Sequence, residues 1–294
     1  MLYQATHTTR YRYQAPVSQS LSESRLTPRS FPGQRLHTSR ITVDPEPALF
    51  EQRTDYFGNH VTTFAVLRAH ERMVTTATSV VEVEASPPPE SKIGWEAARD
   101  LVAEQPDAAA LDAFEFVFPS PYIPTLRELH EYAKPSFPAG ISLLEAAAHL
   151  SHRVYKEFRY QPESTAIEMP LVQILKNRKG VCQDFAHIMI AALRSYGIPA
   201  RYVSGYLRSG KDYQGAEASH AWVAVYLPDA GWVDFDPTND LMPSEGHVTL
   251  AWGRDYGDVT PLKGIALGGG GQIIEVEVRV DPLEPAVQPE VAAS

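Results

Sequence analysis

The residues Gly180-Val-Cys-Gln-Asp-Phe-Ala-His-Ile-Met-Ile-Ala-Ala-Leu-Arg-Ser-Tyr-Gly-Ile-Pro199 form the most regular segment of this 294-residue chain. Within it, apolar side chains recur three or four positions apart, at Phe185, Ile188, Met189, Ala192, Leu193 and Tyr196. This spacing predicts one buried face of an α-helix. Gly197 can adopt the left-handed conformation that ends a helix, and Pro199 cannot continue one. The only cysteine of the chain, Cys182, falls in the first turn of the predicted helix.

The segments around this helix predict a core of both helices and strands. Ile141–Phe158 is predicted to be a helix, because Ser142 and Glu145 give the capping-box pattern at its start. Further helices are expected at residues 94–105 and 126–133. Strands are expected at residues 201–207, 219–227 and 232–236. The last two of these strands are joined by Pro228-Asp-Ala-Gly231, which is typical of a hairpin turn.

The N-terminal residues 1–85 are predicted to be rich in β-structure. Runs of β-branched and aromatic residues occur at positions 8–14, 35–43, 61–66 and 80–83. Asp55-Tyr-Phe-Gly-Asn59 has the glycine and asparagine typical of a turn between two such runs. A small β-sandwich-like domain is therefore expected, and the stiff stretch Ser86-Pro-Pro-Pro-Glu90 is expected to end it.

The predicted domain organisation has four parts. These are a β-rich domain at 1–85, a linker with a helical segment at 86–140, a core at 141–281, and a flexible tail at 282–294. In the last part of the core, Ile and Val alternate with charged residues from Ile274 to Val280, which predicts a half-buried strand. The residues after it are rich in Pro, Ala and Glu, as is common in loose chain ends.

The composition excludes several classes of protein. The chain has 26 Lys and Arg against 36 Asp and Glu, a formal charge of −10. Proteins that bind nucleic acid usually carry a basic face, so no nucleic-acid partner is expected. No apolar run approaches the ~18 residues of a membrane helix, so no membrane is expected. The single thiol and the N-terminus, which lacks a basic patch before an apolar run, predict a cytoplasmic protein. The oligomeric state stays open.

Cys182 has two interpretations. A solitary cysteine is commonly a small buried hydrophobic residue without activity. Here, however, Gly180 allows the backbone to turn sharply where the helix begins. The first turn of a helix has unpaired N–H groups and the positive end of the helix dipole, and both stabilise a thiolate. The position of Cys182 therefore favours a nucleophile at the exposed end of the buried helix face.

A cysteine nucleophile needs a base and a carboxylate that orients the base. His220 is the best candidate base among ten histidines, because it opens a strand whose other residues are apolar. His187 lies between core residues of the helix, which favours a structural role. Asp234 and Asp236 lie on one face of the next strand, and the period of two does not choose between them. The residues therefore predict a Cys–His–Asp group with two alternative carboxylates.

The same residue types could ligate zinc, but the sequence argues against a metal site. There is no second cysteine and no Cys-x-x-Cys pair. The glycine run Gly268–Gly271 is not followed by a Lys-Ser or Lys-Thr pair, so it does not form a phosphate-binding motif. No metal and no cofactor are therefore expected.

Four ordered motifs resemble the core of the transglutaminase-like superfamily, in particular the bacterial group called transglutaminase-like cysteine proteases. They are Gly180–His187, Gly197–Tyr206, Ser219-His-Ala-Trp222 and the segment 231–238 with Gly231-Trp and Asp236-Pro-Thr238. Arg25-Leu-Thr-Pro-Arg29, Asp55–Asn59 and Gly253-Arg-Asp-Tyr256 are similar to motifs that flank this core in the same group. The resemblance implies a papain-like α+β core, in which the cysteine-bearing helix packs on an antiparallel sheet. It also implies a triad of Cys182, His220 and Asp236, which selects Asp236 over Asp234.

The resemblance also implies a reaction on amide bonds of a peptide or protein substrate through a thioester. Water as acceptor makes the protein a cysteine protease or amidase, which we expect. An amine as acceptor makes it a protein-glutamine transglutaminase, and a non-catalytic protein-binding module is a third alternative. Tyr160 is a candidate second oxyanion donor, and Asp184 either holds a loop or caps the helix. Trp222 and Arg254 are candidate substrate contacts, although a tryptophan is more often part of a core.

Overall fold

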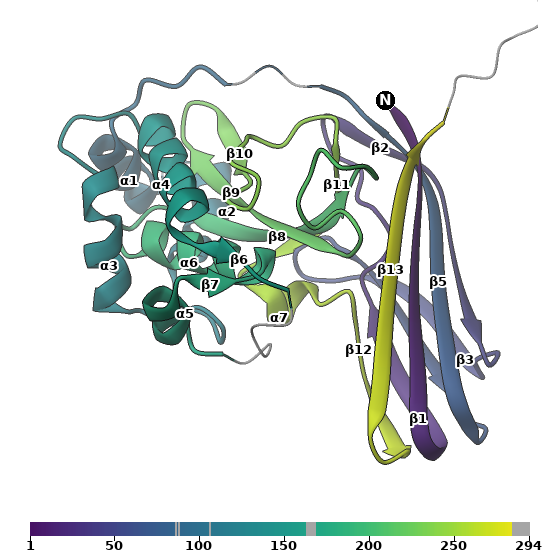
Figure 1. The fold of residues 1–294 in the computed structure, drawn as a ribbon. Coiled ribbons are helices and arrows are strands. Elements are labelled where there is room, and N and C mark those ends of the chain that lie inside the picture. The colour runs from purple at the N-terminus through teal and green to yellow at the C-terminus, as the bar shows by residue number, and fades with distance from the viewer. Residues whose placement is uncertain (86, 88, 106, 163–168, 284–294) are drawn as a thin grey trace, which may run out of the picture.

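The computed structural model describes residues 1–283 except 86, 88, 106 and 163–168. It confirms a mixed fold in which a curled β-sheet stands beside a helix-covered core (Figure 1). Residues 284–294, most of the segment predicted to be a tail, lie outside the described residues. Among the described helices, none is long and apolar enough to cross a membrane.

The curled sheet is built around one long strand. This is β1 (Leu2–Ser24). The other strands of the N-terminal half are β2 (Gln34–Asp44), β3 (Leu49–Thr54), β4 (His60–Val66) and β5 (His70–Val83). The sheet order is β2-β5-β1-β4-β3, and every pair is antiparallel. In the first half of β1, buried residues alternate with partly exposed ones, which is the pattern of a half-buried strand.

The strands of this half form one curled sheet, in which β1 changes partner along its length. Residues 2–12 of β1 pair with β5, whereas residues 20–24 pair with β4, and the register is irregular between Arg12 and Val17. Side chains from several strands of the folded sheet then meet in one apolar cluster, in which Phe64, Val66 and Met73 are buried and Tyr11 and Tyr13 pack against them. Burial of these side chains contributes to the stability of this half.

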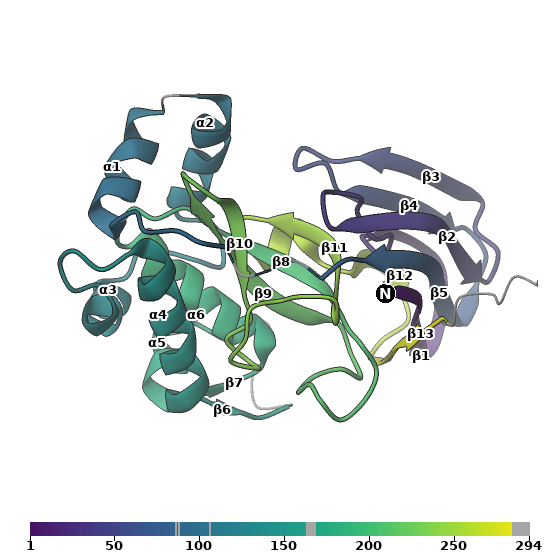
Figure 2. The ribbon, with the colours of Figure 1, turned by 90° about the horizontal axis from the view of Figure 1, so that it is seen from above.

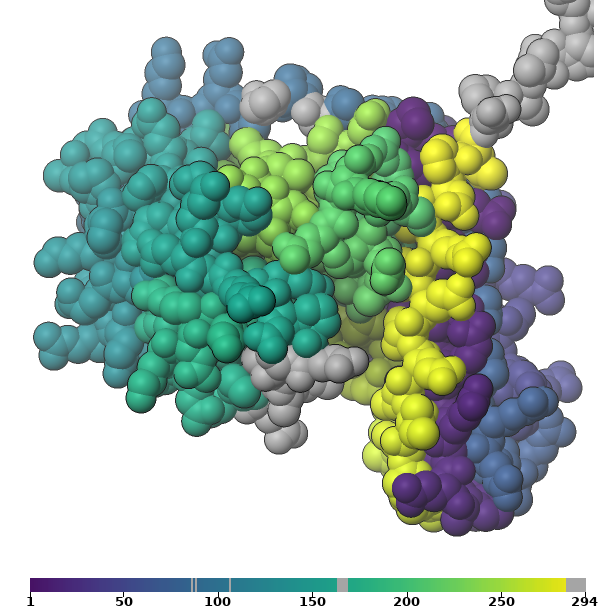
Figure 3. All heavy atoms as spheres, in the orientation of Figure 1, coloured from purple at the N-terminus to yellow at the C-terminus, as the bar shows by residue number. Residues whose placement is uncertain are grey.

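The C-terminal strands return to the N-terminal sheet, which corrects the predicted core boundary at 281. Both β12 (Leu262–Gly268) and β13 (Gln272–Pro282) pair with β1. Figure 3 shows β13 lying along β1 on the outside of the molecule. Only Val278 and Val280 of the predicted half-buried face are buried, whereas Ile274 and Val276 are exposed. Alternation in the sequence identified the strand but not the sheet to which it belongs.

A group of helices covers the core. They are α1 (Trp95–Glu104), α2 (Ala108–Phe114), α3 (Arg127–Ala133), α4 (Leu143–Glu157) and α5 (Leu171–Asn177), with 3-10 turns at Glu115–Val117 and Lys134–Ser136. At the start of α4, Ser142 accepts a hydrogen bond from the N–H of Glu145, and the Glu145 carboxylate accepts one from the N–H of Ser142. This reciprocal bond satisfies two N–H groups that the helix itself leaves unpaired.

The centre of the core is one helix on a four-stranded antiparallel sheet. The helix is α6 (Cys182–Arg194), and the strands are β8 (Ala200–Leu207), β9 (His220–Leu227), β10 (Gly231–Phe235) and β11 (His247–Gly253), in the order β10-β9-β8-β11. The face of α6 that includes Phe185, Ile188 and Leu193 shares one core cluster with alternate residues of β9. A short parallel pair, β6 (Arg159–Tyr160) with β7 (Lys179–Gly180), leads into α6.

The N-terminal half is joined to the edge strand β11 by two side-chain amides. Gln34 accepts from the N–H of Thr249 and donates to its carbonyl, at 2.8 and 2.7 Å. Asn59 does the same with Trp252, at 3.0 and 2.9 Å. These amides bond to the backbone of β11 as a neighbouring strand would, so the sheet edge is satisfied without another strand. Figure 2 shows β11 beside the curled sheet.

Candidate active site

The thiol lies at the N-terminal end of α6, as predicted. Cys182 is the first residue of the helix and is buried, with 9% of its surface exposed. The Asp184 carboxylate accepts a hydrogen bond from the N–H of Val181 at 2.9 Å, so Asp184 caps the helix. Its side chain lies so close to Gly180 that a Cβ atom there would be 2.6 Å from Asp184 Oδ2. A glycine at 180 is therefore what allows the capped turn that carries the thiol.

This packing makes Gly180→Ala a test of how the thiol is positioned. We expect the variant to lower the free energy of unfolding by about 1–3 kcal/mol, the usual cost of overpacking a tight site. Urea denaturation measures this change. Gly94→Ala is the matched control, because Gly94 also precedes a helix but its added Cβ would meet only ordinary contacts of 3.7 and 3.9 Å. Equal losses in the two variants would contradict the role given to Gly180.

His220 and Asp236 form a hydrogen-bonded pair next to Cys182. His220 is the first residue of β9, and Asp236 follows the last residue of β10. The His220 Nε2 atom is 2.8 Å from Asp236 Oδ2, and both side chains are fully buried. The other ring nitrogen, Nδ1, has no hydrogen-bond partner among the described residues. Because Asp236 occupies Nε2, Nδ1 is the nitrogen of His220 that is left to interact with a thiol.

The electrostatics of this pair favour a charged imidazole and a charged carboxylate. Burial alone would lower the pKa of His220, but Asp236 and Cys182 raise it to about 10. Burial alone would raise the pKa of Asp236, but His220 and His247 hold it well below its usual range. The effect of Cys182 on the pKa of His220 shows that the sulfur and the ring are neighbours. The site therefore holds an imidazolium against an ionised carboxylate, with the sulfur of Cys182 as the other neighbour of the ring.

Asp236 is fixed by a turn as well as by His220. Its Oδ1 atom accepts from the N–H groups of Thr238 and Asn239, at 2.9 and 3.3 Å. Its Oδ2 atom accepts from the Asn239 side-chain amide at 2.8 Å and from His247 at 3.2 Å, in addition to His220. A carboxylate with this many donors is held in one orientation.

Asp234 has a different partner, although it shares a strand face with Asp236. Its Oδ2 atom accepts from the Trp222 indole N–H at 2.9 Å. Trp222 is fully buried, and it lies on the face of β9 that points away from α6. This burial does not fit the predicted role of Trp222 as a substrate contact. The indole instead forms part of a packed layer below His220, with ring centres 6.1 Å apart.

Tyr160 lies beside the thiol because β6 pairs with β7. Tyr160 is opposite Gly180 in this pair, two residues before Cys182. Burial, Cys182 and Asp236 together raise the pKa of Tyr160 to about 12, so its hydroxyl keeps its proton at neutral pH. Gly215 lies against both the Tyr160 hydroxyl and the His220 ring. Its φ is +90°, and a Cβ there would be 3.2 Å from the Tyr160 hydroxyl and 3.3 Å from His220 Nδ1.

Two more tyrosines feel the charge of the sulfur, and sequence reasoning did not single them out. Tyr202 of β8 is buried, and burial and Cys182 raise its pKa well above the ordinary value. Tyr256 begins the short helix α7 (Tyr256–Val259), and its pKa is raised by burial, by Tyr122 and by Cys182. The N–H of Tyr256 donates to His187 Nε2 at 3.2 Å. Burial lowers the pKa of His187 to about 4, so this ring is a neutral acceptor with a structural role.

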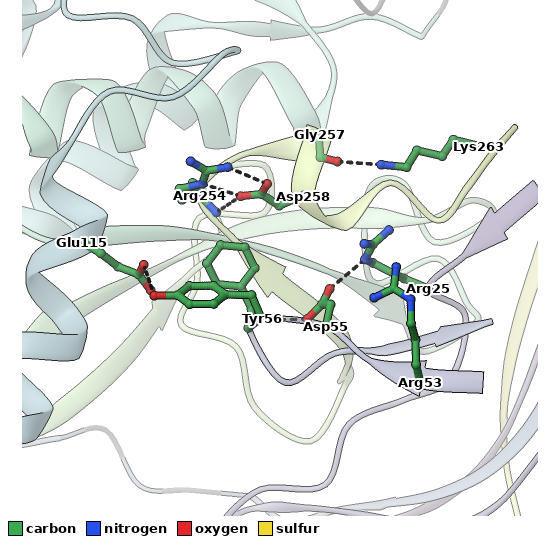
Figure 4. A pocket seen from close by; sticks show the side chains of 10 residues that line it. Arg25, Arg53, Asp55, Tyr56, Glu115, Arg254, Gly257, Asp258 and Lys263 are labelled. Carbon is green, nitrogen blue, oxygen red and sulfur yellow. Dashed lines mark hydrogen bonds and ion pairs between the residues drawn. The ribbon is translucent and has the colours of Figure 1, made fainter. Parts of the chain in front are cut away.

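Arg254 lies at the other end of α6. Its carbonyl accepts from Arg194, the last residue of that helix, at 2.7 Å, and its guanidinium pairs with Asp258 at 2.9 and 3.0 Å. Arg254 and Asp258 line a pocket of about 550 Å³ where the Asp55–Asn59 turn meets the core (Figure 4). Among the described residues, Arg254 has no bond to Cys182, His220 or Asp236. The geometry therefore gives no support to the prediction of Arg254 as an oxyanion or substrate residue.

One set of side chains has the donor types that a metal ion would need. His220, Asp236 and His247 each offer a ligand atom, and these atoms lie within 4.8 Å of one another. In this arrangement, however, both histidines point Nε2 at the same carboxylate oxygen. Each Nε2 must then carry a proton, and a protonated nitrogen has no lone pair for a metal. The contacts therefore describe a hydrogen-bonded group.

The fold and this site define a transglutaminase-like α+β protein with a thiol at a helix N-terminus beside a His–Asp pair. A model for the transglutaminase-like superfamily matches residues 135–237, and a model for the bacterial transglutaminase-like N-terminal region matches residues 3–82. An uncharacterized protein of Mycobacterium tuberculosis is 38% identical over 96% of this chain and 93% of its own length. This chain belongs to the transglutaminase-like superfamily.

Two further proteins extend the comparison. The crystal structure of a candidate cysteine protease from Cytophaga hutchinsonii has a TM-score of 0.74, with 22% identity, over 98% of this chain and 93% of that one. This likeness shows that the two proteins share a fold. A protein-glutamine gamma-glutamyltransferase of Pseudomonas aeruginosa is 33% identical over 105 residues, which are 33% of this chain and 16% of that protein.

Proposed function

We propose that this protein is a cysteine-nucleophile enzyme that cleaves amide bonds of peptides or proteins through a thioester. The observation that carries the proposal is the placement of the His220 ring. Its Nε2 is held by Asp236 at 2.8 Å, and its Nδ1 is left for the neighbouring thiol. A thiol at a helix N-terminus, next to an imidazole oriented by a carboxylate, is the arrangement that nucleophilic catalysis requires.

The proposed reaction has two balanced steps. The thiolate of Cys182 attacks the amide carbon, and the carbonyl electrons move to oxygen. The C–N bond then breaks as Nδ1–H of His220 gives its proton to the leaving amine, which leaves a thioester. Water next attacks the thioester while His220 takes one of its protons. The C–S bond breaks, and the products are a carboxylic acid and the free sulfur with its imidazolium.

The oxyanion of the first step needs donors that are already in place. We assign this role to the backbone N–H of Cys182, which as the first helical residue has no acceptor within α6. The Tyr160 hydroxyl is the proposed second donor. Its position beside Gly180 and its raised pKa, which keeps the proton on oxygen, support this assignment.

The acceptor in the second step decides between hydrolysis and acyl transfer. Hydrolysis is the default fate of a thioester in water, because a transferase must keep water away from the intermediate. The partial likeness to a protein-glutamine gamma-glutamyltransferase is the reason to keep transglutamination as the second candidate.

Mass spectrometry of a peptide library incubated with the protein tests the proposal. We expect cleaved peptides, or glutamine side chains heavier by about one mass unit, in the absence of any added amine. A parallel incubation with a primary amine detects transglutamination as amine adducts. Cys182→Ala is the control and should give none of these products. No product with the wild-type protein in either incubation would contradict an enzymatic function.

A further inference from the structure

His247 is a buried histidine that lies against the proposed catalytic group. It is the first residue of β11, at the edge of the core sheet, and 4% of its surface is exposed. Its ring is perpendicular to that of Trp222, with centres 5.2 Å apart, and it meets Tyr213 edge-on at 5.4 Å. This packing on two sides leaves the ring little freedom to rotate.

The polar contact of His247 is with the same carboxylate oxygen that orients His220. His247 Nε2 lies 3.2 Å from Asp236 Oδ2, and His220 Nε2 lies 2.8 Å from that atom. A carboxylate oxygen accepts and does not donate when it is ionised, so both rings must present an Nε2–H to it. Asp236 therefore stands between two imidazole donors.

The remaining nitrogens of the two rings differ in what they can do. His220 Nδ1 lies on the side of Cys182 and Gly215. His247 Nδ1 is buried and has no hydrogen-bond partner among the described residues. Among the described residues, the one hydrogen bond of the His247 ring is therefore the one that its Nε2–H donates to Asp236.

We propose that His247 is a positioning residue, which donates its Nε2–H to Asp236 Oδ2 and so fixes the carboxylate that orients His220. This inference rests on the proposed function of Cys182, His220 and Asp236. Oδ2 has three donors, from His220, His247 and Asn239. Loss of the His247 donor leaves part of a buried carboxylate unsatisfied, and such a group either rotates toward another donor or becomes easier to protonate.

Other titratable groups also face this histidine. Asp234, on β10, is close enough that His247 lowers its pKa, although burial raises that pKa overall. Asp234 is bonded to the Trp222 indole, and Tyr213 borders the ring on its other side. A test of the proposal must therefore remove the N–H while it keeps the size of the side chain.

His247→Gln and His247→Met form such a pair, because the two new side chains have similar length and only glutamine can donate a hydrogen bond. The readout is the rate at which iodoacetamide alkylates the protein between about pH 5 and pH 9. The chain has one cysteine, so the reagent reports on Cys182 alone. His7→Met is the matched control, because His7 is also buried with one bonded and one unpartnered ring nitrogen.

We expect His247→Met to slow alkylation at about pH 6 roughly tenfold and to move the acid limb of the pH profile to higher pH. This is the effect expected when one hydrogen bond to a charged group, here the Asp236 carboxylate, is lost. His247→Gln and His7→Met should stay within about threefold of the wild type. If glutamine and methionine are equally slow, or methionine is as fast as the wild type, the inference is wrong.

The two proposals fail in different ways. If the wild-type thiol already behaves as an ordinary one and His220→Ala does not change it, the proposed function fails. If His220→Ala slows alkylation and His247→Met does not, only the role of His247 fails. Thermal unfolding of each variant confirms that the compared proteins are folded, and the glutamine–methionine comparison remains decisive for any pair of similar stability.

Discussion

Replacement of His220 by alanine should slow the alkylation of Cys182 at about pH 6 by on the order of 100-fold. An isolated thiol, with a pKa of about 8.5, is less than about 1% ionised at that pH. In the wild type the pKa of His220 is raised to about 10, by Asp236 and Cys182 against the effect of burial. The imidazolium, which favours an ionised sulfur beside it, therefore persists up to about pH 10.

The pH profile separates this result from a general loss of structure. The wild type should react at a nearly constant rate from about pH 6 to pH 9, whereas the rate for His220→Ala should rise about tenfold per pH unit up to about pH 8 and level off above the ordinary thiol pKa of about 8.5. His152→Ala is the matched control, since His152 bonds to Asp240 at 2.8 Å but on the exposed surface. A wild-type profile as steep as that of an ordinary thiol would favour the non-catalytic binding module.

The second large effect is expected from Asp236→Asn. The asparagine can present an N–H where His220 needs an acceptor, and this favours the wrong ring tautomer. A loss of on the order of 10²–10⁴-fold in amide cleavage follows, as is typical when the third member of such a group becomes an amide. Cleavage of a peptide identified in the library experiment provides the measurement.

Asp234→Asn is the internal control for this prediction. Its amide oxygen can still accept from the Trp222 indole, so we expect less than about a threefold loss. Equal losses in the two variants, or a larger loss at 234, would refute the assignment of Asp236.

The dependence of stability on pH gives an independent check of the charge on Asp236. The folded-state pKa of Asp236 lies below its usual value, so its contribution to the free energy of unfolding is full above about pH 4 and is lost as the pH falls further.

Local sequence patterns predicted several parts of the fold well. The Ser142–Glu145 pattern marked the start of α4, and the apolar spacing after Gly180 marked α6. Both are short-range features, because a capping box and a helix face depend on residues three or four positions apart. The strand β11 was not expected, although Val, Thr and Trp between Gly246 and Gly253 are typical of a strand, and neither was a role for His247.

The candidate site was predictable to a similar extent. Alternation placed Asp234 and Asp236 on one face, and only the family resemblance chose between them. In the structure, Asp236 lies just past the end of β10, in a turn that aims it at His220, whereas Asp234 meets Trp222. The Asp-Pro-Thr-Asn turn was a usable signal, since an aspartate commonly accepts the N–H two residues ahead. Nothing local indicated that Trp222 would be buried below the histidine.

The sequence alone determined that a helix begins at the chain's one thiol and which types of residue could act with that thiol. It also indicated an antiparallel sheet that the helix covers. Tertiary structure alone decides which carboxylate meets His220, that His247 shares its oxygen, and that β12 and β13 close the N-terminal sheet. The physical reason is how far apart in the sequence the interacting residues lie. Helix faces and caps depend on neighbours within a turn, whereas contacts between distant strands depend on register and packing, which no local spacing encodes.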